Sequence, residues 1–322
     1  MRKTKRIYIS LLGLVISMFI FGTVSYAWIS LATINNIEGL TLTASSGNEL
    51  QISIDGIEFS NRLPTAVLTE IFEDIRLIDL TSLDGINFEL GGLRDFEGVI
   101  ANEHYLSFDL WFRTIRPERT IYLINNVNDQ VDFNTAIQGT YVVSQGVSWR
   151  ADHSFINGAT MDDIVEKGDI GIYHASDAIR ISVIELNDDL NPLDQRDEEE
   201  LRRFIYDPSE NPSRGYGVPI GMFSYFVQKT KWYIKLPDTF PETSYRLTKF
   251  DTHNPYQALD NESWVATLQE TDEVDNLGRT YYKAKIRVNI WVEGWDADAF
   301  DAIDKDTVLI QLQFKAADKA IE

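Results

Sequence analysis

Hydrophobic and polar positions alternate with a period of two over long parts of the chain. In residues 281–295, the even positions from Tyr282 to Val292 are apolar, and the odd positions between them are mostly charged or polar. Residues 307–314 repeat the pattern with Val308, Ile310, Leu312 and Phe314. Such alternation predicts two strands, each with one buried and one solvent-facing side, joined by a short acidic connection.

Further runs are rich in β-branched and aromatic residues. They cover residues 40–43, 50–54, 105–114, 120–125, 140–149, 178–186 and 223–236. About nine strands without regularly alternating helices indicate a mainly β protein with antiparallel pairing, folded as a β-sandwich.

Two segments have the spacing of short helices. Residues 64–76 place Val67, Leu68 and Ile71 on one helical face, with Pro64 near the start. Residues 194–206 place glutamates four positions before arginines, which favours a solvated helix. We find no internal repeat.

The domain organisation follows from where these patterns are interrupted. We expect a single elaborated β-sandwich domain over residues 28–322, with insertions around 60–80 and 187–262. Two separate domains are the alternative.

The first residues have the pattern of an export signal. Residues 7–24 carry no charge, and they follow four basic residues, namely Arg2, Lys3, Lys5 and Arg6. Ser25 and Ala27 are the small residues that a signal peptidase requires before a cut between Ala27 and Trp28. We therefore expect residues 1–27 to be a signal peptide. The alternative is a retained membrane anchor helix through residues 7–24, the one membrane contact we expect.

Composition narrows the classes of partner. The chain has 29 basic and 50 acidic residues, a formal charge of −21, and no cysteine. Removal of residues 1–27 takes away four basic residues and leaves 25 − 50 = −25. Such acidity argues against binding nucleic acid or anionic lipid. The absence of cysteine excludes disulfides and thiolate chemistry.

No motif assigns a catalytic, cofactor-binding or metal-ligating residue, so we expect no cofactor and no enzyme activity. The four histidines lack zinc-ligand spacing, and no serine lies in a nucleophile elbow. The acidic run at Asp296, Asp298, Asp301, Asp304 and Asp306 resembles a calcium loop in composition. It lacks the spacing of one, so we interpret it as helix capping and solvated charge.

Trp291 and Trp295 fall on the polar side of their strand. Exposed aromatic side chains stack on sugars or fill interfaces, so both are candidate contacts to a partner or a glycan. The alternative is that insertions cover this face and bury them.

Segments at both ends of the sequence carry a resemblance to a known family. Residues 22–30, Gly-Thr-Val-Ser-Tyr-Ala-Trp-Ile-Ser, and residues 36–42, Asn-Ile-Glu-Gly-Leu-Thr-Leu, resemble the leader and first strand of the camelysin/TasA group of exported Gram-positive proteins. Residues 286–296 resemble a strand near the end of surface proteins with the same kind of leader. The likeness covers about a fifth of the chain. It implies a jelly-roll sandwich and processing by a dedicated signal peptidase.

The resemblance also implies a structural role. In the fibre-forming branch of the group, a terminal strand enters the sheet of the neighbouring subunit, and residues 28–34 are an apolar segment suited to this. We expect an extracellular or cell-surface matrix protein that associates with itself or with other surface proteins. A monomeric glycan- or ligand-binding surface protein, anchored or secreted, is the alternative, and a hydrolase that uses unidentified carboxylates comes third.

Overall fold

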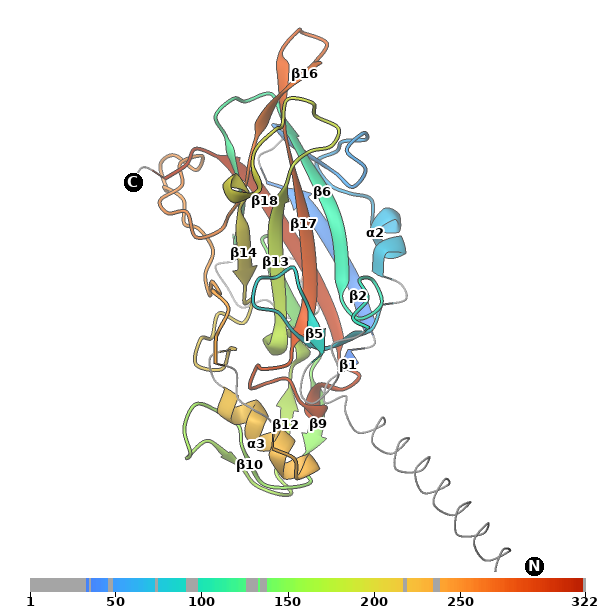
Figure 1. Cartoon of the computed structure of the whole chain (residues 1–322), viewed down its shortest axis with the longest axis vertical. Helices are drawn as coiled ribbons and strands as arrows, with labels where there is room; N and C mark the ends of the chain where they lie inside the picture. The colour runs from blue at the N-terminus through green and yellow to red at the C-terminus, as the bar shows by residue number, and fades with distance from the viewer. Residues whose placement is uncertain are drawn as a thin grey trace, which may run out of the picture.

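The computed structural model describes residues 33–34, 36–45, 49–72, 75–90, 98–125, 133, 138–216, 219–233 and 238–320. The expected signal peptide or anchor, residues 1–27, lies outside the described residues, as do Ala27, Trp28 and the segment up to residue 32. The described chain is mainly β, with two large sheets, two short ribbons and few helices (Figure 1).

The larger sheet is organised around one long central strand. Within the described residues it has nine strands: β1 (Thr33–Ile34), β3 (Leu50–Ser53), β4 (Leu77–Thr81), β5 (Glu89–Leu90), β6 (Leu106–Thr114), β13 (Ile179–Leu186), β14 (Arg203–Tyr206), β16 (Gln269–Val274) and β17 (Thr280–Glu293). β17 pairs with β13 along one edge and with β6 and then β4 along the other. The strand predicted at residues 281–295 is therefore confirmed, and the structure places it at the centre of this sheet.

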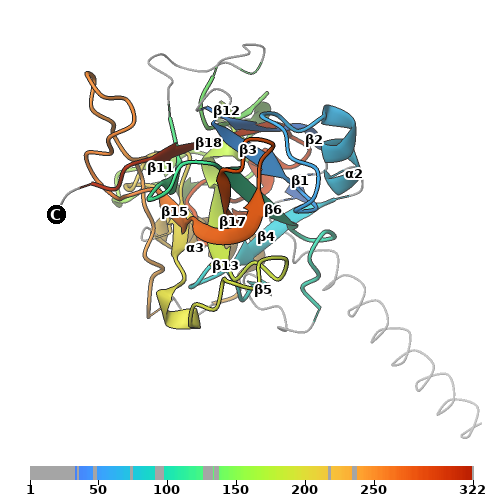
Figure 2. The ribbon, with the colours of Figure 1, turned by 90° about the horizontal axis from the view of Figure 1, so that it is seen from above.

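The smaller sheet supplies the opposite wall of the core. Its described strands are β2 (Asn36–Ala44), β7 (Thr120–Leu123), β8 (Tyr141–Ser144), β15 (Trp264–Thr267) and β18 (Thr307–Ala317). Figure 2 shows β2 and β18 along one side of the molecule and β4 and β13 along the other. The apolar positions of β17 and β18 belong to one buried cluster, in which Phe112 and Phe314 meet with ring centroids 5.0 Å apart. The predicted inward faces of both strands are correct.

Most strand pairs are antiparallel, as expected. Two are parallel, namely β17 with β4 and β18 with β2. The mainly β class is established, whereas a jelly-roll order of the strands is not.

A lobe at one end of the molecule has a core of its own. It contains the ribbon of β9 (Val147–Arg150) and β12 (Ile170–Tyr173), the ribbon of β10 (Phe155–Ile156) and β11 (Ile164–Val165), and helix α3 (Pro219–Thr230) (Figure 1). Tyr225 of α3, Phe155 and Phe300 pack in this second cluster. Their aromatic edges meet at centroid distances of 5.0 to 5.4 Å, a preferred geometry for such rings.

The helices agree only in part with the sequence-based predictions. Helix α2 (Thr65–Phe72) confirms the prediction for residues 64–76. The strand predicted at residues 223–236 is wrong, because α3 occupies its first half and packs against β10. The solvated helix predicted at 194–206 is also wrong. That segment has one 3-10 turn, η2 (Glu198–Glu200), and then β14, whose backbone pairs with β13. Two more 3-10 turns are η1 (Ala175–Ala178) and η3 (Asp301–Ile303).

The predicted wet face of β17 is covered. Lys283, Asn289 and Trp291 are buried, and of the odd positions from 283 to 293 only Arg287 is exposed. Loops from distant parts of the sequence lie over this face. Asn289 donates to the carbonyl of Gly85 at 2.8 Å, and Lys283 lies over the ring of Phe59, 5.4 Å from its centroid.

Two of these loops are copies of one seven-residue pattern, Ser-x-Asp-Gly-Ile-x-Phe, at residues 53–59 and 82–88. In each loop the aspartate accepts two backbone N–H bonds and the glycine has a positive φ, +73° at Gly56 and +72° at Gly85. The chain thus contains an internal repeat, contrary to our reading of the sequence. Both copies follow a strand of the larger sheet and pack on its outer face, Gly56 beside Trp111 and Gly85 beside Ser182.

Candidate functional site

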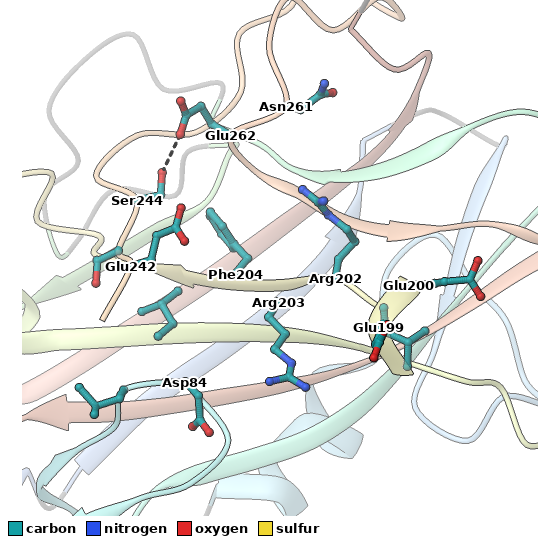
Figure 3. Close-up of a pocket in the computed structure, with 14 residues that line it drawn as sticks. Asp84, Glu199, Glu200, Arg202, Arg203, Phe204, Glu242, Ser244, Asn261 and Glu262 are labelled. Atoms are coloured by element: carbon teal, nitrogen blue, oxygen red, sulfur yellow. Dashed lines mark hydrogen bonds between the residues drawn. The ribbon is translucent and has the colours of Figure 1, made fainter. Parts of the chain in front are cut away.

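An open groove of about 820 Å³ runs beside β14 (Figure 3). It is formed by the loop after β4, by η2 with the residues up to Ile205, and by two loops near Ser244 and Glu262. The side chains that give it its character are Asp84, Glu199, Glu200, Arg202, Arg203, Phe204, Glu242, Ser244, Asn261 and Glu262. Acidic side chains outnumber basic ones, so the groove favours hydroxyl, amide or cationic ligands.

The backbone beside the groove is a sheet edge that is only partly closed. β14 pairs with β13 on one side. On the other side, Ser244 N–H donates to the carbonyl of Ile205 at 2.8 Å, and Asp207 N–H donates to the carbonyl of Ser244 at 3.0 Å. This contact closes the end of the edge near Asp207 and leaves the end near Arg203 beside the groove.

Most charges in the groove already have partners. Arg203 pairs with Glu198 at 3.1 Å, and Arg246 pairs with Glu262 at 2.7 Å. The Arg202 guanidinium lies over the Trp264 ring, 4.1 Å from its centroid. Because these pairs are solvent-exposed, each holds its geometry weakly, and a polar ligand can replace it at small cost.

Asp84, which lines the groove from the loop after β4, is held by backbone hydrogen bonds. Burial of Asp84 would raise the pKa of its carboxyl, but N–H groups of Asn87 and Ile86, each 2.8 Å away, outweigh it and lower that pKa. A smaller pocket of about 340 Å³ adjoins the groove and shares Leu201 and Arg203 with it. The pair can hold a polar extended ligand together with one apolar group.

A second cluster of charges is fully enclosed between the larger sheet and the lobe. Arg180 of β13 donates to Asp296 and lies 2.9 Å from Asp207. Glu293, at the end of β17, accepts from the indole of Trp291 at 3.0 Å and from the backbone of Trp295 at 3.1 Å. One guanidinium therefore faces three buried carboxyl groups.

This imbalance shifts the protonation of the carboxyl groups. Burial raises the pKa of Glu293 to about 7, although Trp291 and Arg180 oppose the shift. Burial also raises the pKa of Asp207 and of Asp296 despite the adjacent Arg180. All four side chains of this cluster are buried, so none of them is open to a ligand in this structure.

The acidic run between β17 and β18 is mostly committed to structure, so the prediction of solvated charge is wrong for most of it. Asp296 pairs with Arg180, Asp298 with Arg214 at 2.8 Å, and Asp301 with Lys229. Asp306 is buried and accepts from the backbone of Gly146 and Ala175 at 2.9 and 2.8 Å. In the described part of the chain, no group of three or more histidine or carboxylate side chains could hold a metal ion.

The two tryptophans proposed as partner or glycan contacts are inside the protein. Trp291 is 0% exposed and packs against Phe88, and Trp295 is 8% exposed in the core of the lobe. Neither indole face is available to a ligand in this structure. The alternative interpretation of the sequence, in which other parts of the chain cover this face and bury both tryptophans, agrees with the structure. The groove residues were missed because their local signal, a run of charges before Phe204, indicated a helix.

Comparison with known proteins gives no relative. No family model matches the chain, and neither curated proteins nor solved structures yield a match. Among the described helices, none has the length and hydrophobicity needed to cross a membrane, and residues 7–24 lie outside the described residues.

Proposed function

We propose that this protein is an exported structural subunit of the cell surface or extracellular matrix, cut between Ala27 and Trp28 by a signal peptidase. Its two sheets would form a jelly-roll sandwich. Subunits would assemble when the segment before β1, residues 28–32, pairs with a sheet edge of the next copy. Thr33 and Ile34, which the sequence placed in the exchanged segment, pair with β4 of their own chain instead.

The observation that supports this proposal is the crowding of one edge of β4. Leu77 and Ile78 pair with β1, while Leu80 and Thr81 pair with β5 on the same edge, opposite β17. An antiparallel strand continuing β1 toward its N-terminus would meet β5 after one more residue. β5 thus occupies the positions of β4 that a longer β1 would need, and this favours pairing of the preceding segment with another chain.

The test is assembly of a shortened chain. Deletion of residues 28–32 leaves β1 intact, including Ile34, which is fully buried. We expect filaments of the mature protein in negative-stain images and none from the shortened protein. Filaments of normal length from the shortened protein would refute strand exchange, and a protein that starts at Met1 in the membrane fraction would refute cleavage.

A second candidate function is favoured by the groove beside β14. Its polar lining suits a glycan or another polar ligand, and Phe204, which is buried in the main core, closes one side of it. In this alternative the protein is a monomeric ligand-binding surface protein, anchored or secreted. Binding to a glycan array that is lost in Arg203→Met and kept in Arg116→Met, whose side chain pairs with Glu49 away from the groove, would support it.

A further inference from the structure

The lobe carries a strand edge with no pairing partner among the described residues. β12 pairs with β9 alone, in the register Ile170 opposite Arg150 and Ile172 opposite Ser148. Ala151 N–H donates to the carbonyl of Asp169 at 2.9 Å. Because hydrogen-bonded pairs alternate along an antiparallel ladder, the backbone groups of Ile170 and Ile172 then point away from β9.

The same strand exposes apolar side chains. Ile170 and Ile172 are 60% and 67% exposed, and they share the outer face of the ribbon with Ser148 and Arg150. The inner face, with Trp149 and Tyr173, packs on Phe300. A flat, uncharged edge strand with exposed β-branched residues pairs readily with another strand unless a proline, a charge or a bulge prevents it. β12, Ile-Gly-Ile-Tyr, has none of these.

We propose that β12 pairs antiparallel with β12 of a second copy of this chain, about a two-fold axis at Gly171. In this register Ile170 lies opposite Ile172 of the second copy. These are the residues whose backbone N–H and C=O groups point away from β9, so each strand would supply hydrogen-bond partners for the other. The four isoleucine side chains meet on one face of a continuous four-stranded sheet, as cross-strand neighbours.

The charges around the strand agree with a second copy as the occupant. The chain is strongly acidic, so most surfaces of two copies repel each other. In the proposed register, Asp169 lies opposite Tyr173 and Lys167 lies opposite Ala175, so no carboxylate faces another. The edge of β14 is a poorer site for self-pairing, because charged side chains line the groove beside it.

The contact is small compared with the ~1,200–2,000 Å² of a stable interface, so we expect a weak dimer. It is independent of the proposed strand exchange by the segment before β1. A chain without residues 28–32 should still dimerise, so failure of the proposed function and failure of this inference give different results.

Sedimentation velocity of the protein recovered from surface fractions, from ~10 µM to ~1 mM, tests the proposal. We expect a dimer whose association weakens by about tenfold or more in I170D/I172D. The matched control is I164D, which changes another half-exposed isoleucine in the same lobe and should leave the dimer unchanged. A wild-type protein that stays monomeric, or a dimer that I170D/I172D does not weaken, would overturn the proposal.

Cross-linking tests the register, because the natural chain has no cysteine. A mixture of I170C and I172C chains should form a covalent dimer on oxidation. Either variant alone should form far less, since like residues in this register lie beyond the ~7 Å Cα separation that a disulfide can bridge. Equal cross-linking of the single variants and the mixture would contradict the two-fold axis at Gly171.

Discussion

Trp291 and Glu293, two residues apart on the same face of β17, are bonded to each other, indole Nε1 to carboxyl Oε2 at 3.0 Å. Both side chains are buried. The tryptophan supplies a hydrogen bond that a buried carboxyl group requires, and this explains why an indole lies among the polar residues of the strand.

The raised pKa of Glu293 predicts a pH-dependent stability. Between pH ~4.5, where an unfolded glutamate ionises, and about 7, the folded state keeps the proton that the unfolded state has lost. Stability therefore falls as pH rises through this window. The difference in unfolding free energy between wild type and Glu293→Gln should decrease by on the order of 3 kcal/mol from pH 4 to pH 8. Urea unfolding at several pH values measures it, and Glu199→Gln, at an exposed position, is the control. A constant difference would contradict the assignment.

Arg180 should be among the most sensitive positions in the protein. Arg180→Met leaves Asp207 and Asp296 buried without their counter-charge and should cost roughly 3–5 kcal/mol of unfolding free energy. Arg203→Met removes an exposed pair with Glu198 and should cost no more than about 1 kcal/mol. If R180M is too unstable to purify, R180M with Asp207→Asn and Asp296→Asn should recover part of the loss. Equal costs for the two single variants would contradict a role of the cluster in stability.

Two glycines of similar backbone conformation, Gly85 in a repeated loop and Gly278 in the turn between β16 and β17, should differ in the cost of an alanine substitution. A Cβ at Gly85 would lie 2.5 Å from the Cβ of Ser182, whereas a Cβ at Gly278, φ +76°, would meet nothing within 4 Å. Gly278→Ala should therefore lose only the backbone preference, about 1–2 kcal/mol. Gly85→Ala should lose a further ~1–3 kcal/mol from overpacking. Thermal unfolding of the two variants compares them directly.

Asp306 should stabilise the start of β18. Its two carboxylate oxygens accept from the backbone of Gly146, Ala175 and Thr307. Asp306→Asn keeps one acceptor oxygen and replaces the other by an amide donor, so we expect a loss of about 1.5–3 kcal/mol. Asp304→Asn, in the same acidic run but more exposed, should change stability by less than ~0.5 kcal/mol. If both substitutions changed the free energy of unfolding by a similar amount, Asp306 would be no more important for stability than a solvent-exposed aspartate.

The sequence predicted the strands whose one face is apolar, because alternation records burial directly. Val308, Ile310 and Leu312 are core residues as expected. The sequence did not predict that the second face of β17 is also buried. Burial of Lys283 or Asn289 depends on loops that are distant in sequence, and a polar side chain looks the same whether water or a carbonyl group satisfies it.

Local patterns failed where tertiary pairing decided the structure. Glutamate and arginine spacing favoured a helix at residues 194–206. Phe204 and Tyr206 instead lie in a strand, because the backbone of this segment pairs with that of β13. The groove could not be predicted, since it depends on the meeting of three loops. The repeated Ser-x-Asp-Gly-Ile-x-Phe was visible in the sequence and could have predicted two equivalent turns.

The pairing of β17 also fixes the order in which the sheet can form. This strand begins at Thr280, yet it joins β4, β6 and β13, which are all made earlier during synthesis. Until β17 emerges from the ribosome, β4, β6 and β13 lack the strand with which all three pair. The parallel partner of β2, which is β18, is synthesised later still. A nascent chain cut off before Thr280 should therefore expose unpaired β edges, and such a chain requires protection from aggregation until β17 and β18 have been made.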